Sequence, residues 1–305
     1  MAKRILVAGC SNINFTVNTP YIPAPNETMV SNKGYSFAPG GRGANTAVAL
    51  AMFENEVILC SRVGDDSYGD KLLQLFAQSK VDTRFVKVDR LEQTGMEVIL
   101  SERNGNFRKI AFNGANGKIS DSDIENAFEC CPDAIITQLD LRSEAVIAAA
   151  HSAAYDAIPL FVDAGALKKN FPLEKLEKIA VLSPNEDETE ILTGIRPDNL
   201  QNCLRASIAL CNRADIGFVV LKLGSRGCYV YDGKYCDLIS PLEVEVVDKT
   251  AAGDVFTAAL ASEFLRTNDM IAAAKFANAA AALSVMKKGG IASFPTLDDI
   301  RDALI

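Results

Sequence analysis

The stretch Val246-Val247-Asp248-Lys249-Thr250-Ala251-Ala252-Gly253-Asp254 leads from a predicted strand through small residues into an alanine-rich helical pattern. At the start of that helix, the N–H groups of Ala252, Gly253 and Asp254 would be free and would point outward. Together with the helix dipole they would form an anion site, and the small side chains would let a phosphate approach the backbone. Asp254 would either complement the dipole or act as a general base beside a transferring phosphoryl group. The residues alone favour the first role.

The rest of the chain alternates short β-branched runs with amphipathic stretches, a pattern typical of a mostly parallel sheet covered by helices on both faces. The predicted strands are Ile5–Ala8, Val57–Leu59, Ala134–Ile136, Leu160–Val162, Ile179–Leu182 and Phe218–Leu221. The predicted helices are Ala44–Phe53, Tyr68–Gln78, Asp121–Phe128, Ser143–Tyr155, Glu186–Leu192, Leu200–Cys211, Gly253–Leu265 and Met270–Met286, with a last helix beginning near Thr296. We therefore expect an α/β fold.

Two regions interrupt this alternation. Thr28–Phe37 and Gly95–Phe112 are predicted to be strands without an intervening helix, and the second contains Asn104-Gly105, a strong hairpin signal. These strands would form either a small separate sheet, which would act as a lid, or an antiparallel edge of the main sheet. We find no repeat, low-complexity linker or second core.

Composition narrows the possible functions. The 305 residues carry 31 basic and 39 acidic side chains, a net charge of −8 without a basic block, so no nucleic-acid partner is expected. No apolar run approaches the ~18 residues of a membrane span, and residues 1–10 are predicted to be a strand rather than a signal peptide, so we expect a cytoplasmic protein with no membrane partner.

The eight cysteines fit reduced core thiols. The single histidine, His151, argues against a Ser-His-Asp triad. Either the protein is not an enzyme, or a carboxylate, Lys, Cys or Tyr carries out its acid–base chemistry.

Two polar turns lie near the start of the chain. The segment Pro39-Gly40-Gly41-Arg42-Gly43-Ala44-Asn45 begins a predicted helix, and its glycines would let a ligand approach the backbone. It matches neither a dinucleotide-binding pattern nor a P-loop. The segment Gly9-Cys10-Ser11-Asn12-Ile13-Asn14 follows the first strand, where open α/β sheets bind ligands, although it would also serve as a simple turn.

Two more polar segments follow later strands. In Ser183-Pro184-Asn185-Glu186-Asp187-Glu188, Asn185 and Glu188 are three residues apart and would share a helix face. Their oxygens would suit Mg²⁺, directly or through water, but an ordinary acidic first helical turn is equally compatible. The segment Leu223-Gly224-Ser225-Arg226-Gly227 would form a hairpin turn or a nucleotide-contacting loop.

In combination, these segments resemble the ribokinase (PfkB) family of kinases. An Asn-containing turn, Gly-Gly-Arg-Gly-Ala-Asn, Pro-Asn-Glu-x-Glu, Leu-Gly-Ser-Arg-Gly and Asp-x-x-Ala-Ala-Gly-Asp occur in the order and spacing of that family, and the likeness extends to Lys287–Pro295. The resemblance implies one domain over residues 1–305, with a three-layer α/β/α core, a mostly parallel sheet and a small β-sheet lid. The lid strands are expected within residues 10–38 and 92–115, and the lid would also form a homodimer interface.

The activity implied by the resemblance is ATP-dependent phosphorylation of a primary hydroxyl of a small sugar, with Mg²⁺ and K⁺ as further cofactors. Asp254 would be the catalytic base, and Ala251, Ala252 and Gly253 would form the anion hole. The implied acceptor-binding residues are Asn12, Asn14, Gly41, Arg42, Asn45, Asp140 and Asp254. The implied nucleotide-binding residues are Asn185, Lys222, Gly224, Ser225, Gly227, Ala252, Gly253 and Asn278. The implied metal ligands are Asn185 and Glu188 for Mg²⁺, and Asp248, Thr250, Ser284, Lys287, Gly289 and Ser293 for K⁺.

Three of the residues implied to bind the acceptor depart from the family pattern. Ribokinases carry Asp where this chain has Asn14, tend to carry Glu where it has Asp140, and tend to carry Lys where it has Arg42. An amide lacks the charge that strengthens hydrogen bonds to hydroxyl groups, and Arg is not equivalent to Lys. The acceptor is therefore left open between ribose, a fructose-like ketose, a nucleoside and a sugar acid. The alternatives to a sugar kinase are a nucleoside kinase of the same fold and a non-catalytic sugar-sensing protein, which would have no need of Asp254.

Overall fold

The core of the computed structural model, which describes residues 2–102, 107–165 and 171–304, is a nine-stranded sheet. Its strand order is β13-β12-β11-β10-β9-β8-β1-β4-β5. Strand β12 is antiparallel to both of its neighbours, β11 and β13, and all other neighbouring strands are parallel. The strands are β1 (Arg4–Ala8), β4 (Glu56–Gly64), β5 (Asp82–Asp89), β8 (Ala134–Gln138), β9 (Leu160–Asp163), β10 (Ile179–Ser183), β11 (Ile216–Lys222), β12 (Cys228–Tyr231) and β13 (Cys236–Ile239). All six predicted core strands are confirmed.

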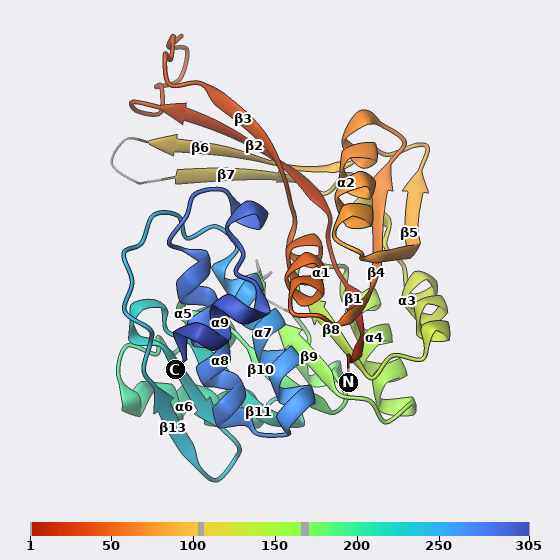
Figure 1. Cartoon of the computed structure of the whole chain (residues 1–305), viewed down its shortest axis with the longest axis vertical. Helices are drawn as coiled ribbons and strands as arrows, with labels where there is room; N and C mark the ends of the chain where they lie inside the picture. Colours follow the sequence, from red (N-terminus) through yellow and green to blue (C-terminus); the bar gives the residue numbers. More distant parts are fainter. Residues whose placement is uncertain (1, 103–106, 166–170, 305) are drawn as a thin grey trace.

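Helices cover both faces of this sheet (Figure 1). One layer contains α1 (Arg42–Met52), α2 (Ser67–Gln78), α7 (Ala252–Thr267), α8 (Met270–Ser284) and α9 (Leu297–Ala303). The other contains α3 (Asp121–Ala127), α4 (Ser143–Tyr155), α5 (Glu186–Thr193) and α6 (Leu200–Cys211). Strand β1 shows why the strands are apolar throughout, since Ile5 and Val7 enter one core while Leu6 and Ala8 enter the other. The predicted three-layer α/β/α arrangement is confirmed.

A second sheet of four strands, in the order β3-β2-β6-β7, projects from the core beside α2 and extends over the loops that precede α7 and α9 (Figure 1). It comprises β2 (Asn12–Thr19), β3 (Tyr35–Gly40), β6 (Gly95–Glu102) and β7 (Phe107–Phe112). Strands β2 and β6 are parallel, and the other two pairs are antiparallel. The small sheet is therefore separate from the main sheet, which excludes the alternative of an antiparallel edge. The predicted turn at Asn104-Gly105 lies outside the described residues.

Several strands differ from the sequence prediction. The strand predicted at Thr28–Phe37 runs instead from Tyr35 to Gly40, because the described chain turns at Gly34, whose φ is +77°, before pairing begins at Tyr35. The segment that contains Asn12 and Asn14 is the start of β2 rather than a turn, since it pairs with both β3 and β6. Strands β5, β12 and β13 were not predicted, and charged residues interrupt β5 at the edge of the sheet. The strand predicted at Val246-Val247 is wrong, because this segment joins neither of the described sheets and the N–H of Val247 donates instead to the Val285 carbonyl at 2.8 Å. None of the described helices is long and apolar enough to cross a membrane.

Candidate functional site

The first turn of α7 presents backbone donors at the carboxyl ends of the parallel strands. Ala251 is the N-cap, with φ of 63°, and its carbonyl accepts the N–H of Val255 at 3.0 Å. The N–H of Ala252 donates to the Lys249 carbonyl at 3.4 Å, so the prediction that it would be free is wrong. The N–H groups of Gly253 and Asp254 have no acceptor within residues 2–102, 107–165 and 171–304. Two free donors therefore remain to hold an anion.

The Asp254 carboxylate lies where the first turns of α7 and α1 meet. It is 5% exposed, and its Oδ2 atom accepts a hydrogen bond of 2.7 Å from the Asn45 amide. Its Oδ1 atom lies 3.8 Å from the guanidinium of Arg42. Burial raises the pKa of Asp254 to about 6, although Arg42 and Asn45 favour the ionised form. A carboxylate with this pKa is ionised at pH 7 and is basic enough to accept a proton.

Arg42 lies among four carboxylates that come from four different parts of the chain. Its nitrogens are 3.8 Å from Asp140, 3.9 Å from Asp163, 3.7 Å from Glu188 and 3.8 Å from Asp254. Burial raises the pKa of Asp140 to about 6 and that of Glu188 to about 7, and the nearby Asp163 adds repulsion. Arg42 and, at Glu188, also Lys222 offset these effects only in part. The surplus of negative charge favours a site that binds further cations.

The predicted acceptor residues meet under the small sheet. Asn12 uses its Oδ1 atom to accept a 2.7 Å hydrogen bond from Asn116, a residue that the sequence analysis missed. Gly41 has φ of 93°, and a Cβ there would lie 2.6 Å from the Cys10 carbonyl, so this position requires glycine. The Oδ1 atoms of Asn14 and Asp140 are buried without a hydrogen-bond partner in the described part of the chain. Buried polar atoms of this kind are normally satisfied, so a ligand with hydroxyl groups would fit here.

A cavity of about 710 Å³ adjoins these residues, on the side of β10, β11 and α7. All eight predicted nucleotide-binding residues line it, and Arg42 lines it as well. These eight are Asn185, Lys222, Gly224, Ser225, Gly227, Ala252, Gly253 and Asn278. Lys249, to which the sequence assigned no definite role, also lines the cavity. The acceptor residues and the cavity therefore adjoin at Arg42, close to Asp254.

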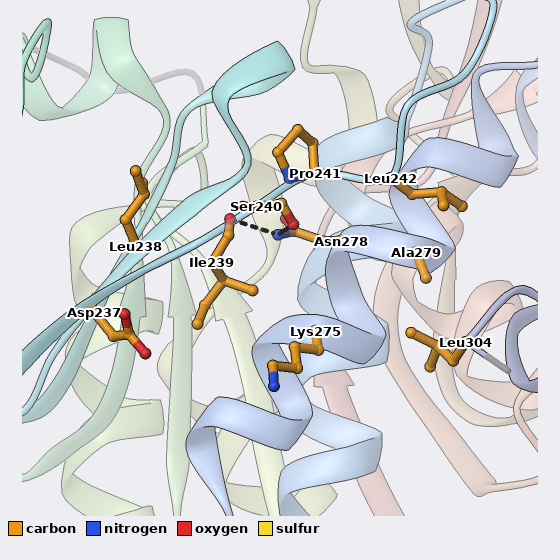
Figure 2. Close-up of a pocket in the computed structure, with 10 residues that line it drawn as sticks. All are labelled: Asp237, Leu238, Ile239, Ser240, Pro241, Leu242, Lys275, Asn278, Ala279 and Leu304. Carbon is orange, nitrogen blue, oxygen red and sulfur yellow. Dashed lines mark hydrogen bonds between the residues drawn. The ribbon is translucent and has the colours of Figure 1, made fainter.

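Asn278 lines this cavity and, like Pro241 and Leu242, also lines a smaller one of about 390 Å³, which Figure 2 shows. Its amide nitrogen donates to the carbonyls of Ile239 and Ser240, at 3.1 Å each. The side chain therefore fixes the segment that follows β13. A ligand in the larger cavity would find the donors of this amide already occupied, so Asn278 supports the wall of the cavity.

The Asn185 and Glu188 side chains form a reciprocal capping box at the start of α5. The Asn185 Oδ1 atom accepts the N–H of Glu188 at 2.9 Å, and Glu188 accepts the N–H of Asn185 at 2.8 Å. The other Glu188 oxygen faces Arg42. In the described ranges, no group of three or more His, Cys, Asp or Glu side chains converges to hold a metal ion. Any divalent ion here would need oxygen atoms from a ligand or from water in addition to Glu188.

The residues predicted to hold K⁺ lie in two adjoining segments. The Asp248 carboxylate accepts the N–H groups of Thr250 at 2.9 Å and Gly289 at 3.1 Å, which ties the loop before α7 to the loop after α8. The N–H of Asp248 itself donates to the Val285 carbonyl, next to Ser284. The side chains of Ser284 and Ser293 bond to backbone carbonyls in their own turns, and that of Lys287 is exposed. The contribution of these segments to a cation site would come mainly from backbone oxygens.

Asp163, at the end of β9, is a second residue of this site that was not predicted from the sequence. It is 1% exposed and bonds to Lys222 and Thr257. A polar residue that closes a buried strand is a usable signal in an open α/β sheet, because ligands bind at the carboxyl ends of the strands. No motif marks this position, so the sequence alone did not single it out.

The crowding of carboxylates around Arg42 predicts that Asp140→Asn stabilises the ligand-free protein. The pKa of Asp140 is raised in the folded state, so its ionisation destabilises the fold as the pH rises. We expect the free energy of unfolding at pH 8 to increase by about 1–3 kcal/mol, and the gain to shrink towards pH 4. Urea denaturation at several pH values measures this difference. Glu125→Gln, at an exposed position on α3, is the control. A gain that does not depend on pH would contradict the account.

Comparison with known proteins identifies relatives over the full length of the chain. The model of the pfkB family carbohydrate kinases matches residues 2–297. The ribokinase of Haemophilus influenzae is 31% identical over 306 residues, which cover 100% of this chain and 99% of that protein. The deoxyribokinase of Salmonella typhi is 26% identical over 302 residues, which cover 98% of this chain and 98% of that protein. The structure of Arabidopsis thaliana ribokinase complexed with ribose and ATP is 29% identical, has a TM-score of 0.91 and covers 100% of this chain, with 99% of its own chain matched.

The match with the Arabidopsis thaliana structure extends over the whole chain, so it includes both the three-layer core and the small sheet. The chain belongs to the pfkB family of carbohydrate kinases.

Proposed function

We propose that this protein transfers the γ-phosphoryl group of ATP to a primary hydroxyl of a small sugar, with ribose or a related pentose or ketose as the acceptor. The observation that carries this proposal is the position of Asp254. Its carboxylate is buried, has a raised pKa of about 6, and lies between the acceptor residues and the 710 Å³ cavity. A hydroxyl that reaches Asp254 from the acceptor side would face a phosphate held at the start of α7.

The residues around Asp254 would each have a separate role in this reaction. Asp254 takes the proton of the hydroxyl as its oxygen forms a bond to the γ-phosphorus, and the bond to the departing ADP breaks. The free N–H groups of Gly253 and Asp254 stabilise negative charge on the phosphoryl oxygens. Asn45 holds the carboxylate in place, and Arg42 lies near enough to contact both the phosphate and the acceptor.

Mg²⁺ would be bound between the nucleotide phosphates and the turn that contains Asn185 and Glu188. The donor chemistry fits, because Glu188 is a buried carboxylate with one oxygen outside the capping box, and the surrounding charge is negative. The ion would neutralise phosphate charge. Glu188 would hold it directly or through water, and Asn185 would fix the orientation of Glu188.

The outer face of the small sheet supports a homodimer as part of this proposal. Phe15 pairs with Phe37 across β2 and β3, and their rings stack at 4.6 Å. Val98 and Ile110 continue the same face across β6 and β7. Tyr35, two residues before Phe37, is 71% exposed. An apolar sheet face of this kind is typical of a subunit interface, while Asn14 and Glu97 lie on the opposite face, towards the acceptor. The eight cysteines, all unpaired, favour a cytoplasmic enzyme.

Asp254→Asn tests the proposed base. We expect turnover to fall by about 10²–10⁴, because an amide cannot accept the proton, whereas the affinity for Mg-ATP should change little. In the unaltered enzyme, kcat/KM should decline as the pH falls below about 6, where Asp254 becomes protonated. Coupled ADP-release assays and calorimetric titration with ATP measure the two quantities. Near-normal turnover in this variant would show that another group is the base.

A monovalent cation is the second test. The segments around Asp248 and Gly289 adjoin the anion-binding turn, so K⁺ bound to their backbone oxygens would hold that turn in place. We expect activity to rise when K⁺ replaces a bulky organic cation at constant ionic strength, with Na⁺ less effective. Identical rates in K⁺, Na⁺ and the organic cation would remove the proposed site.

A further inference from the structure

Asp163 is a buried carboxylate to which no role in the reaction has been given. Its Oδ2 atom accepts hydrogen bonds from the Lys222 ammonium at 2.8 Å and from the Thr257 hydroxyl at 2.6 Å. Its Oδ1 atom accepts the N–H of Gly165 at 3.1 Å and lies 3.9 Å from Arg42. The carboxylate is thus bonded from β11, from α7 and from its own loop, which leaves it no freedom to move.

Whereas Asp163 is enclosed by protein groups, Lys222 borders the cavity. Its side chain is 10% exposed, it lines the 710 Å³ cavity, and its ammonium lies 3.8 Å from where a Cβ on Gly253 would be. The ammonium is therefore next to the free N–H groups at the start of α7. In the described structure it donates to Asp163 alone, so two of its three N–H donors remain for a ligand.

A lysine side chain has four rotatable carbons, and on its own it would not stay beside Gly253. Ion pairs buried in a protein core contribute little net stability compared with well-packed apolar residues, so packing alone does not explain this one. A pair at the wall of a ligand cavity, with spare donors on the cationic partner, is suited to binding an anion.

We propose that Asp163 is a positioning residue for the nucleotide. It holds the Lys222 ammonium, with the help of Thr257, beside Gly253, where Lys222 donates to the outer phosphates of the nucleotide. This inference rests on the proposed function only in that the anion is the phosphate tail of a nucleotide. Because Asp163 is itself negative, simple charge repulsion predicts the opposite effect, namely that removing it would tighten nucleotide binding.

The test is a double-mutant cycle measured by calorimetric titration with Mg-ADP, which needs neither an acceptor nor turnover. We expect Asp163→Asn and Lys222→Met each to weaken Mg-ADP binding by about 10- to 100-fold. The double variant should bind Mg-ADP within about twofold of Lys222→Met, because Asp163 acts through Lys222. Affinity for AMP, which lacks the outer phosphates, should change little in all three variants, whereas a general loss of packing would weaken AMP as well.

Two comparisons keep the test decisive if Asp163→Asn alone does not fold. Thr257→Val removes one hydrogen bond from Asp163 without changing the charge, and it should weaken Mg-ADP binding by about 2- to 10-fold. The second comparison is between the double variant, in which both charges are absent, and Lys222→Met, and it does not require the single variant Asp163→Asn. Unchanged or tighter Mg-ADP binding in Asp163→Asn, or a double variant more than fivefold weaker than Lys222→Met, would overturn the inference while leaving the kinase proposal intact. Failure of the unaltered protein to bind Mg-ADP would instead contradict the proposed function itself.

Discussion

The hydrogen bond between Asn45 and Asp254 joins two helix starts that are 209 residues apart in the sequence. It exists because α1 and α7 both begin at the carboxyl ends of the parallel strands, on the same face of the sheet. The glycine-rich turn before α1 brings Arg42 and the acceptor residues to this point, and the turn before α7 brings the free N–H groups. The candidate site therefore consists of Arg42, the proposed acceptor residues and the free N–H groups of α7, which these two turns bring together.

Electrostatic balance is the second constraint. Four carboxylates surround Arg42, and Lys222 pairs with one of them, so the ligand-free site holds more negative than positive charge. Burial makes this arrangement costly, as the raised pKa values of Asp140, Glu188 and Asp254 show. Such a site favours the binding of metal ions together with phosphates. It would also favour a neutral, hydroxyl-rich acceptor over an acidic one, because Asp140, one of the four carboxylates, and Glu97 lie on the proposed acceptor side.

The sequence was sufficient to predict six of the nine strands of the main sheet, the two helix layers and a set of residues that together line the 710 Å³ cavity. Buried parallel strands and glycine-rich turns leave strong local patterns. It was not sufficient where a residue depends on tertiary pairing. Asn12 and Asn14 looked like turn residues, yet they lie on a strand that is paired on both sides. Asn116 and Asp163 belong to no motif, and their partners lie 104 and 59 residues away. The occupied N–H of Ala252 follows from the turn at Ala251, which composition alone does not reveal.

The most direct test of the central claim is acceptor-dependent ADP release from Mg-ATP in the presence of K⁺, with Asp254→Asn as the blank. The panel would comprise ribose, 2-deoxyribose, fructose, a sugar acid and several nucleosides. The account predicts a signal well above the blank for one neutral pentose or ketose, with the phosphate on its primary hydroxyl, and none for the sugar acid. A preference for a nucleoside would contradict the proposed acceptor. ATP binding without a response to any acceptor would contradict the proposed activity and favour a sugar-sensing protein.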